Sequence, residues 1–232
     1  MIKIRKAEQR GATRLSWLDS RHTFSFGEYY DLAEMGFSAL RVINEDRVAP
    51  GGGFPSHGHR DMEIVTYVLE GALEHRDNLG NHSVIPAGDV QRMTAGTGIV
   101  HSEFNPSQTE PVHFLQIWIL PAQTGLKPGY EQKTLEKNPP RGNWRLIVSD
   151  GSHDGALAIN QDARLYFANF DAGQNAAAPI QAGRSAYIHV ARGTVKVGGL
   201  NLSEGDGARV SGQSRLEVNA AAESEVLVFD LP

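Results

Sequence analysis

The second half of the chain repeats the strand and turn pattern of the first half. Residues 187–195, YIHVARGTV, correspond to residues 65–73, VTYVLEGAL, and residues 202–206, LSEGD, correspond to residues 84–89, VIPAGD. In each copy an apolar run rich in β-branched and aromatic residues is followed by a glycine, which is typical of a strand that ends in a turn. Such a repeat indicates two copies of one structural unit. We therefore predict an all-β chain that folds as two consecutive barrels.

A segment rich in proline and glycine separates the two copies. Residues 121–145 contain four prolines and three glycines, a composition typical of a connection between domains. We predict a first barrel at residues 1–125, a linker at residues 126–145 and a second barrel at residues 146–232. Within the linker, residues 130–133, YEQK, are predicted to form a short strand.

Composition excludes several classes of protein. The chain has no cysteine, which excludes disulfides and thiolate chemistry. Its net charge of -5 and the lack of a long run of lysine and arginine argue against nucleic acid as a partner. Residues 1–6 carry positive charge without a following apolar region, so they do not resemble a secretory signal. No apolar run has the length of a membrane span. We expect a cytoplasmic monomer.

Two short motifs in the first half carry side chains that bind metal ions, His57-Gly58-His59 and His101-Ser102-Glu103. Side chains at positions i and i+2 of a strand point to the same face, so two inward-facing strands would bring three imidazoles and one carboxylate together. A single His-x-His motif is a weak signal, and ordinary surface or core histidines are the alternative interpretation. The glycines ahead of His57 and the turn at residues 86–89 favour a metal site in the mouth of a barrel.

The composition of this ligand set indicates the kind of metal. It contains no cysteine, unlike a typical closed zinc site, and it leaves about two positions free on a six-coordinate ion. An open site of this kind suits a divalent transition metal that also binds substrate, oxygen or both. We expect one metal per chain, because both motifs lie in the first half.

Other polar side chains of the first half are assigned different roles. We predict that Glu63 makes a contact outside the ligand set or on the surface, because it lies four residues beyond His59, roughly 13 Å at about 3.3 Å per residue of extended strand. Glu103 is therefore the predicted carboxylate ligand. The remaining histidines are predicted to be structural or exposed, with His22 structural or on the surface, His75 and His82 exposed beside a turn at residues 78–81, and His113 not a ligand.

The metal motifs also resemble those of a known superfamily. Residues 51–63 resemble the first motif of the cupins through Gly51, His57, His59 and Glu63, and residues 80–88 resemble the second. Cupins have a histidine three residues after the last glycine of the second motif, where this chain has Gln91. The arrangement in which His101 supplies that imidazole is similar to the pirin family. The segments that carry this resemblance are residues 17–26, 59–71 and 93–103, and it extends over about residues 1–120.

The resemblance to pirins implies a fold, a metal and an activity. It implies two double-stranded β-helix barrels, Fe(II) and quercetin 2,3-dioxygenase activity, in which oxygen cleaves the heterocycle of a flavonol with release of carbon monoxide. The partners would be a flavonol or a similar aromatic enol and O2. His57, His59, His101 and Glu103 would bind the metal, and Glu103 would also act as a base. Purified protein could carry nickel, zinc, manganese, cobalt or copper instead, because affinity favours the later metals of the first row.

Two other functions are compatible with the same site. Pirins of eukaryotes are linked to transcriptional regulation, so the chain could be a redox-sensitive regulator that binds a protein partner through its metal domain. A metal-dependent isomerase or hydrolase is the third hypothesis, because a barrel of this kind does not fix the chemistry. Oxygen consumption with a flavonol distinguishes the dioxygenase from both.

Overall fold

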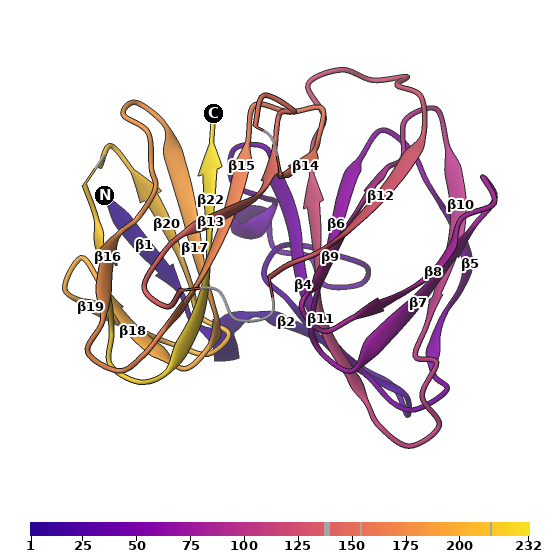
Figure 1. Ribbon diagram of the computed structural model, residues 1–232, viewed down its shortest axis with the longest axis horizontal. Coiled ribbons are helices and arrows are strands. Elements are labelled where there is room, and N and C mark those ends of the chain that lie inside the picture. Colours follow the sequence, from indigo (N-terminus) through magenta and orange to yellow (C-terminus); the bar gives the residue numbers. More distant parts are fainter. Residues whose placement is uncertain (137–139, 154, 214) are drawn as a thin grey trace.

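Two β-barrels lie side by side in the computed structural model (Figure 1). The structure describes residues 1–136, 140–153, 155–213 and 215–232. Within these residues each barrel consists of one seven-stranded sheet and one four-stranded sheet. The predicted all-β fold with two consecutive barrels is confirmed. No helix of the described chain has the length and apolar character needed to cross a membrane.

The first barrel has a large sheet with the strand order β12-β9-β6-β11-β4-β3-β2 and a small sheet with the order β5-β10-β7-β8. Its strands are β2 (Gly11–Arg14), β3 (Leu18–His22), β4 (Leu40–Val48), β5 (Gly53–His59), β6 (Glu63–Glu70), β7 (Ala72–Asp77), β8 (His82–Pro86), β9 (Asp89–Thr94), β10 (Ile99–Phe104), β11 (Val112–Ile119) and β12 (Gly129–Thr134). Short 3₁₀ helices lie at η1 (Ala7–Gln9) and η2 (Leu32–Glu34).

The second barrel repeats this plan, with the orders β1-β20-β17-β22-β15-β13-β14 and β16-β21-β18-β19. Its strands are β1 (Ile2–Arg5), β13 (Arg145–Ser149), β14 (Leu157–Ala158), β15 (Arg164–Phe170), β16 (Asn175–Ala177), β17 (Ser185–Arg192), β18 (Thr194–Val197), β19 (Leu200–Ser203), β20 (Gly207–Ser211), β21 (Glu217–Ala220) and β22 (Ser224–Leu231). In the small sheet, β16 and β21 take the places that β5 and β10 have in the first barrel. The second barrel is filled by apolar side chains such as Val195, Leu202 and Val218.

An equivalent glycine ends one long strand of the large sheet in each copy. Gly71 follows β6 with φ +71°, and Gly193 follows β17 with φ +80°. A Cβ on Gly71 would lie 2.7 Å from the carbonyl oxygen of Pro111, and one on Gly193 would collide with the carbonyl of Glu223. Because both the dihedral angle and the space require glycine, the repeated glycines seen in the sequence mark the same turn in each barrel.

The two large sheets face each other across the middle of the molecule, and the small sheets lie on the outside (Figure 1). Alternate residues of each large sheet enter one shared apolar cluster, for example Val65 and Ile117 from the first barrel and Phe167 and Leu227 from the second. The other alternate residues point into their own barrel. Both faces of the large sheets are therefore buried, which explains the nearly continuous apolar run of β11.

Two strands cross the domain boundaries that we predict. Strand β1 pairs with β20 of the second barrel, and β12, within the predicted linker, pairs with β9 of the first. The strand expected at residues 130–133 is thus present. Residues 137–139 of the predicted linker lie outside the described residues. The division into residues 1–125, 126–145 and 146–232 remains our proposal for the domains, with β1 joining the second barrel and the linker strand β12 joining the first.

A buried ion cluster lies where the barrels meet. Arg10 Nη2 donates to Glu45 Oε2 over 2.6 Å, and His113 Nε2 donates to Glu45 Oε1 over 3.0 Å. Burial alone would raise the pKa of Glu45, but the hydrogen bond from His113 and the charge of Arg10 hold that pKa well below its ordinary value of 4.5. Since the pKa is depressed in the folded state, the ionised carboxylate stabilises the fold above pH 4.5, and this contribution is lost as the pH falls towards the folded pKa.

Replacing Glu45 by glutamine should destabilise the protein by about 3–5 kcal/mol at pH 7, because Arg10 then remains buried and charged without its partner. The difference from the wild type should shrink as the pH falls below 4.5. Urea unfolding at several pH values measures both effects. Glu204→Gln is the matched control, because the Glu204 side chain is half-exposed beside Arg47 and should contribute little. Equal stability of Glu45→Gln and wild type at pH 7 would contradict this account.

Candidate metal centre

Strands β5 and β10 bring the two predicted metal motifs together in the small sheet of the first barrel. His57 lies opposite His101 in the antiparallel pairing, and Ile99 lies opposite His59. The register shifts before Glu103, which pairs with Phe54, so β5 has one extra residue around Pro55 and Ser56. Proline cannot donate to the ladder and is tolerated at such a bulge.

The three histidines form one cluster. Their ring centroids are 4.4 Å apart for His57 and His101, 4.8 Å for His57 and His59, and 4.9 Å for His59 and His101. One ring nitrogen from each lies within 4.8 Å of the others. Glu103 forms a second group of this kind with His101 and His75. The two groups share His101, so they adjoin each other, and within the described residues no such group occurs in the second barrel.

Hydrogen bonds fix which nitrogen of the His57 and His101 rings is free. His57 Nδ1 lies 2.8 Å from the carbonyl oxygen of Pro55, which can only accept, so this nitrogen carries the proton and Nε2 has a free lone pair. His75 Nε2 lies 3.1 Å from Asp77 Oδ2, and His75 Nδ1 lies 3.3 Å from His101 Nδ1. The Asp77 carboxylate can only accept, so His75 Nε2 donates to it, and His75 Nδ1 therefore accepts from His101 Nδ1. Among the residues that the structure describes, His101 Nε2 has no hydrogen-bond partner and is buried.

Burial also keeps the rings in the form that binds metal. Desolvation, followed by the nearby imidazoles, lowers the pKa of His101 to about 2 and that of His59 to about 4. Neutral imidazole with an unpartnered buried nitrogen is the state that a metal ligand requires. The cluster therefore has the closely spaced, neutral imidazoles that a metal-binding site requires.

Glu103 is buried and is held by one donor. Gln116 Nε2 lies 3.1 Å from Oε1 and 3.0 Å from Oε2 of Glu103, and Gln116 in turn accepts from the Thr66 hydroxyl. Burial raises the pKa of Glu103 to about 7, against the pull of Gln116. A cation bound beside it would favour the ionised form. Glu103 thus has an environment in which it can both bind a cation and exchange a proton.

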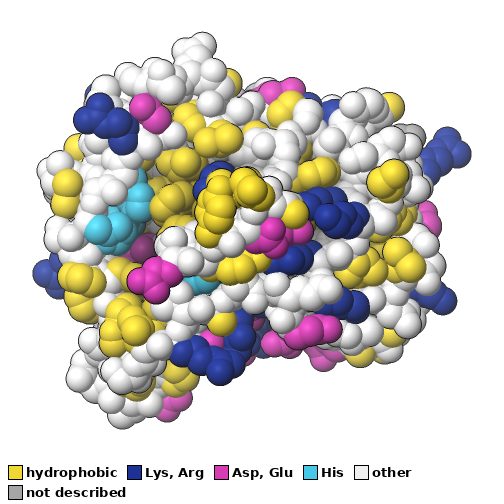
Figure 2. Space-filling model, turned by 180° about the vertical axis from the view of Figure 1, so that it is seen from behind, with side chains coloured by type: hydrophobic (Ala, Val, Ile, Leu, Met, Phe, Trp, Pro, Cys, Tyr) yellow, Lys and Arg dark blue, Asp and Glu magenta, His cyan; other side chains and the backbone are white. Residues whose placement is uncertain are grey.

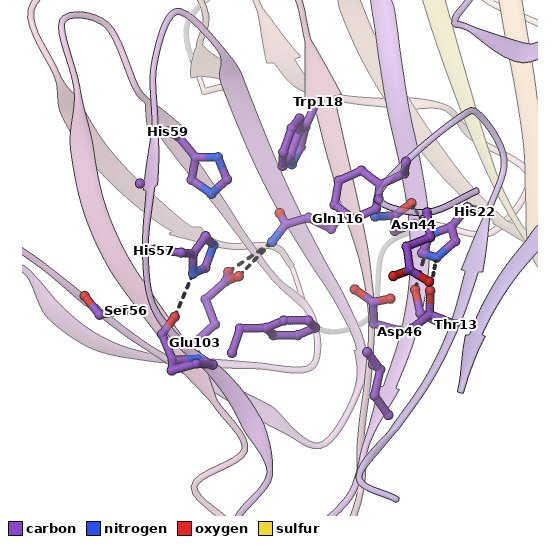
Figure 3. A pocket seen from close by; sticks show the side chains of 18 of the residues that line it. Thr13, His22, Asn44, Asp46, Ser56, His57, His59, Glu103, Gln116 and Trp118 are labelled. Atoms are coloured by element: carbon purple, nitrogen blue, oxygen red, sulfur yellow. Dashed lines mark hydrogen bonds between the residues drawn. The ribbon is translucent and has the colours of Figure 1, made fainter. Parts of the chain in front are cut away.

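A cavity of about 800 Å³ opens beside the histidines, a volume typical of a pocket for a small organic ligand. Leu18, Phe26, Phe54 and Trp118 supply its apolar walls, and the Gln116 side chain extends from β11 of the large sheet to Glu103 beside His57 (Figure 3). On the face seen in Figure 2, histidine side chains reach the surface next to a hollow with hydrophobic side chains. The arrangement can therefore hold an apolar, planar molecule against a metal.

Comparison with known protein families agrees with this geometry. The model of the pirin family matches residues 3–119, and the model described as the quercetinase C-terminal cupin domain matches residues 146–231. The chain belongs to the pirin family. A pirin relative from Escherichia coli K12, named quercetin 2,3-dioxygenase, is 47% identical over 232 residues, which cover 100% of this chain and 99% of the relative.

Solved structures of relatives share the whole fold. The bacterial pirin YhhW from Escherichia coli in complex with nickel(II) matches with a TM-score of 0.95 and 46% identity, over 100% of this chain and 99% of that chain. A quercetin 2,3-dioxygenase from Acinetobacter baumannii matches with a TM-score of 0.79 over 96% of this chain and 85% of that chain, and at 22% identity it shows the fold alone. The resemblance to pirins and the fold that it implies are confirmed.

The structure corrects two predictions about neighbouring residues. His75 is fully buried behind His101, not exposed, because β7 pairs with β10 and places it in the barrel wall. Glu63 is also fully buried, so a surface contact is wrong. It accepts hydrogen bonds from Thr94 and from Asn160 of the second barrel, and none of its described hydrogen bonds reaches the histidines. Asp61, with φ +49°, turns the chain before β6, so Glu63 is not on the strand of His59.

The other histidines lie as expected or in one of the expected places. His82 is exposed, and His113 donates to Glu45 between the barrels. His22 is buried and structural, and it also lines the cavity.

Sequence reasoning missed Gln116, Asp77 and the supporting role of His75. Two signals were available. Gln116 is the one strongly polar residue of the run from Phe114 to Leu120, and His75 and Asp77 have the i, i+2 spacing of the metal motifs themselves.

Proposed function

We propose that this pirin is a metal-dependent dioxygenase that cleaves the heterocycle of flavonols such as quercetin with O2 and releases carbon monoxide. The observation that carries the proposal is the cluster of three histidines and Glu103 at one wall of an apolar cavity of about 800 Å³. The name of the relative from Escherichia coli, which is 47% identical over its length, supports the substrate class.

We propose His57, His59, His101 and Glu103 as the metal ligands. The unpartnered buried Nε2 of His101 and the proton fixed on Nδ1 of His57 fit this role. Fe(II) is the metal that we infer for the working enzyme, and nickel(II) is bound in the related YhhW structure. When bound, such a metal would polarise the flavonol and orient its enol oxygen.

The residues of the chain then have separate tasks. Glu103 takes the proton of the flavonol 3-hydroxyl, and a bound cation would keep its carboxylate ionised and ready to accept that proton. Gln116 holds the Glu103 carboxylate in place through its amide. Trp118 and Phe54 lie on either side of the planar rings of the substrate and exclude water from the cavity.

Anaerobic reconstitution tests the proposal. Metal-free protein is loaded with Fe(II), mixed with quercetin and then exposed to oxygen, and carbon monoxide and oxygen are measured together. Stoichiometric release of carbon monoxide with oxygen uptake is the expected result. Metal binding without oxygen consumption would instead favour the regulator that binds a protein partner, and conversion of a substrate without oxygen would favour an isomerase or hydrolase.

Replacing His75 by phenylalanine should weaken metal binding by about 10- to 100-fold, the usual effect of losing a partner that orients a ligand. Phenylalanine retains the ring beside Tyr130, whose centroid lies 4.8 Å away, but cannot accept from His101 Nδ1. Competition with a coloured chelator measures the affinity. His82→Phe is the control, because His82 is exposed on the next strand and should leave the affinity unchanged. If His75→Phe binds metal like the wild type, His75 does not position His101.

A further inference from the structure

The cavity has a second polar wall, which faces the histidines from the far side. Strands β2, β3 and β4 of the large sheet contribute it, and Figure 3 shows His22, Asn44, Thr13 and Asp46 across the cavity from His57 and His59. The strand β4 alternates here, so Asp46 points into the cavity and its neighbour Glu45 points to the second barrel. None of the tasks proposed above uses this wall.

Most of the hydrogen-bonding groups in the polar wall are already paired with other groups of the protein. Thr13 Oγ1 lies 2.8 Å from His22 Nε2, and His22 Nδ1 lies 2.8 Å from Asn44 Oδ1. Burial lowers the pKa of His22, so the ring is neutral. Its Nδ1 donates to the Asn44 carbonyl, and its Nε2 accepts from the Thr13 hydroxyl. These two hydrogen bonds hold the His22 ring in place, and they leave it no ring nitrogen for a ligand.

Asp46 is different, because one of its oxygens is free. Burial raises the pKa of the Asp46 carboxyl to about 7, against the pull of the Ser20 hydroxyl, and its Oδ1 is buried without a hydrogen-bond partner among the described residues. A buried acceptor without a partner costs about 1–3 kcal/mol, so such a group in a cavity wall indicates a ligand or a water molecule that completes it. Leu18, on the strand next to β4, and Phe54 line the cavity as apolar surface.

We propose that Asp46 is a specificity-determining residue whose carboxyl group accepts a hydrogen bond from a phenolic hydroxyl on a ring of the substrate remote from the enol. The inference rests on the proposed function, in which the enol oxygen faces the histidines. The substrate class is then an aromatic enol that carries a hydroxyl on a remote ring. A flavonol without such hydroxyls would fill the cavity but leave the Asp46 carboxyl without this hydrogen bond.

The test removes each partner in turn. Wild type, Asp46→Leu and Asp46→Ala are loaded with Fe(II) and compared on quercetin and on 3-hydroxyflavone, which has no hydroxyl on its outer rings. Anaerobic binding is followed by quenching of tryptophan fluorescence, and kcat and KM are measured with oxygen. The wild type should prefer quercetin over 3-hydroxyflavone. In both variants the ratio of the two affinities should fall about tenfold, which corresponds to the loss of one hydrogen bond. The loss should appear in quercetin affinity and KM, with 3-hydroxyflavone little changed.

Two controls define the outcome. Asp46→Asn keeps a polar group that can pair with a hydroxyl, so it should retain most of the preference, and Asp19→Asn alters an exposed acid of β3 outside the cavity and should retain all of it. Asp46→Ala removes the oxygen without adding bulk, so it answers the question if Asp46→Leu fails to fold. An unchanged preference in Asp46→Ala would overturn the inference while the dioxygenase proposal stands. Failure of every protein to bind either flavonol would overturn both.

Discussion

Replacing His101 by alanine should abolish retention of the metal while leaving both barrels folded. Of the three histidines, His101 is the most buried, and its Nε2 has no other partner. Its loss removes a ligand outright, so the effect should exceed the roughly 10- to 100-fold weakening expected for a residue that only orients a ligand. Metal analysis after dialysis against a weak chelator gives the occupancy, and circular dichroism reports the fold.

The fold should survive because the metal contributes little to it. The large apolar cluster between the barrels and the filled second barrel lie away from the histidines and supply the stability of a chain of this length. His82→Ala, a change at an exposed histidine, should keep full metal occupancy. A globally unfolded His101→Ala protein would show that the centre is structural and would weaken the case for an enzyme.

Replacing Glu103 by glutamine should reduce flavonol turnover by about 10²- to 10⁴-fold, the range for loss of a general base. The amide cannot accept the proton of the flavonol, although three histidines would still hold some metal. In the wild type the amide group of Gln116 donates to the Glu103 carboxylate. The same amide can hydrogen-bond the glutamine side chain of the variant and keep it in place. Single-turnover kinetics on metal-loaded protein separate slower chemistry from weaker substrate binding.

Glu63→Gln is the matched control for this experiment. Glu63 is equally buried, but it accepts from Thr94 and Asn160 at the contact between the barrels. It should therefore keep both metal and turnover. If Glu63→Gln is inactive and Glu103→Gln is unaffected, the assignment of the carboxylate is wrong.

The architecture was predictable because the repeat is local. Runs such as residues 65–73 and 187–195 contain both the strand and the glycine that must follow it, and Gly71 and Gly193 have the required positive φ in both barrels. The destination of β1 was not predictable in this way. Its pairing with β20 joins residues about two hundred positions apart, and alternation of Ile2 and Ile4 does not specify a partner.

The same distinction applies to the site. The i, i+2 spacing was sufficient to place His57 and His59 on one face, because it depends only on strand geometry. The position of His101 opposite His57 depends on the pairing of β10 with β5. The burial of His75 follows from the pairing of β7 with β10, which is a tertiary fact. The argument from distance along the strand failed for Glu63, because the positive φ of Asp61 ends the strand before it.

The alternation along β4 has a consequence for how this enzyme can change. Neighbouring residues of that strand serve different surroundings, since Glu45 belongs to the ion cluster between the barrels and Asp46 to the cavity. A substitution at Glu45 therefore affects mainly the contact between the barrels, and one at Asp46 affects mainly the cavity. Substrate range can shift through every second residue of the large sheet while the joint between the barrels is retained, so libraries that vary only cavity-facing positions should contain many folded members.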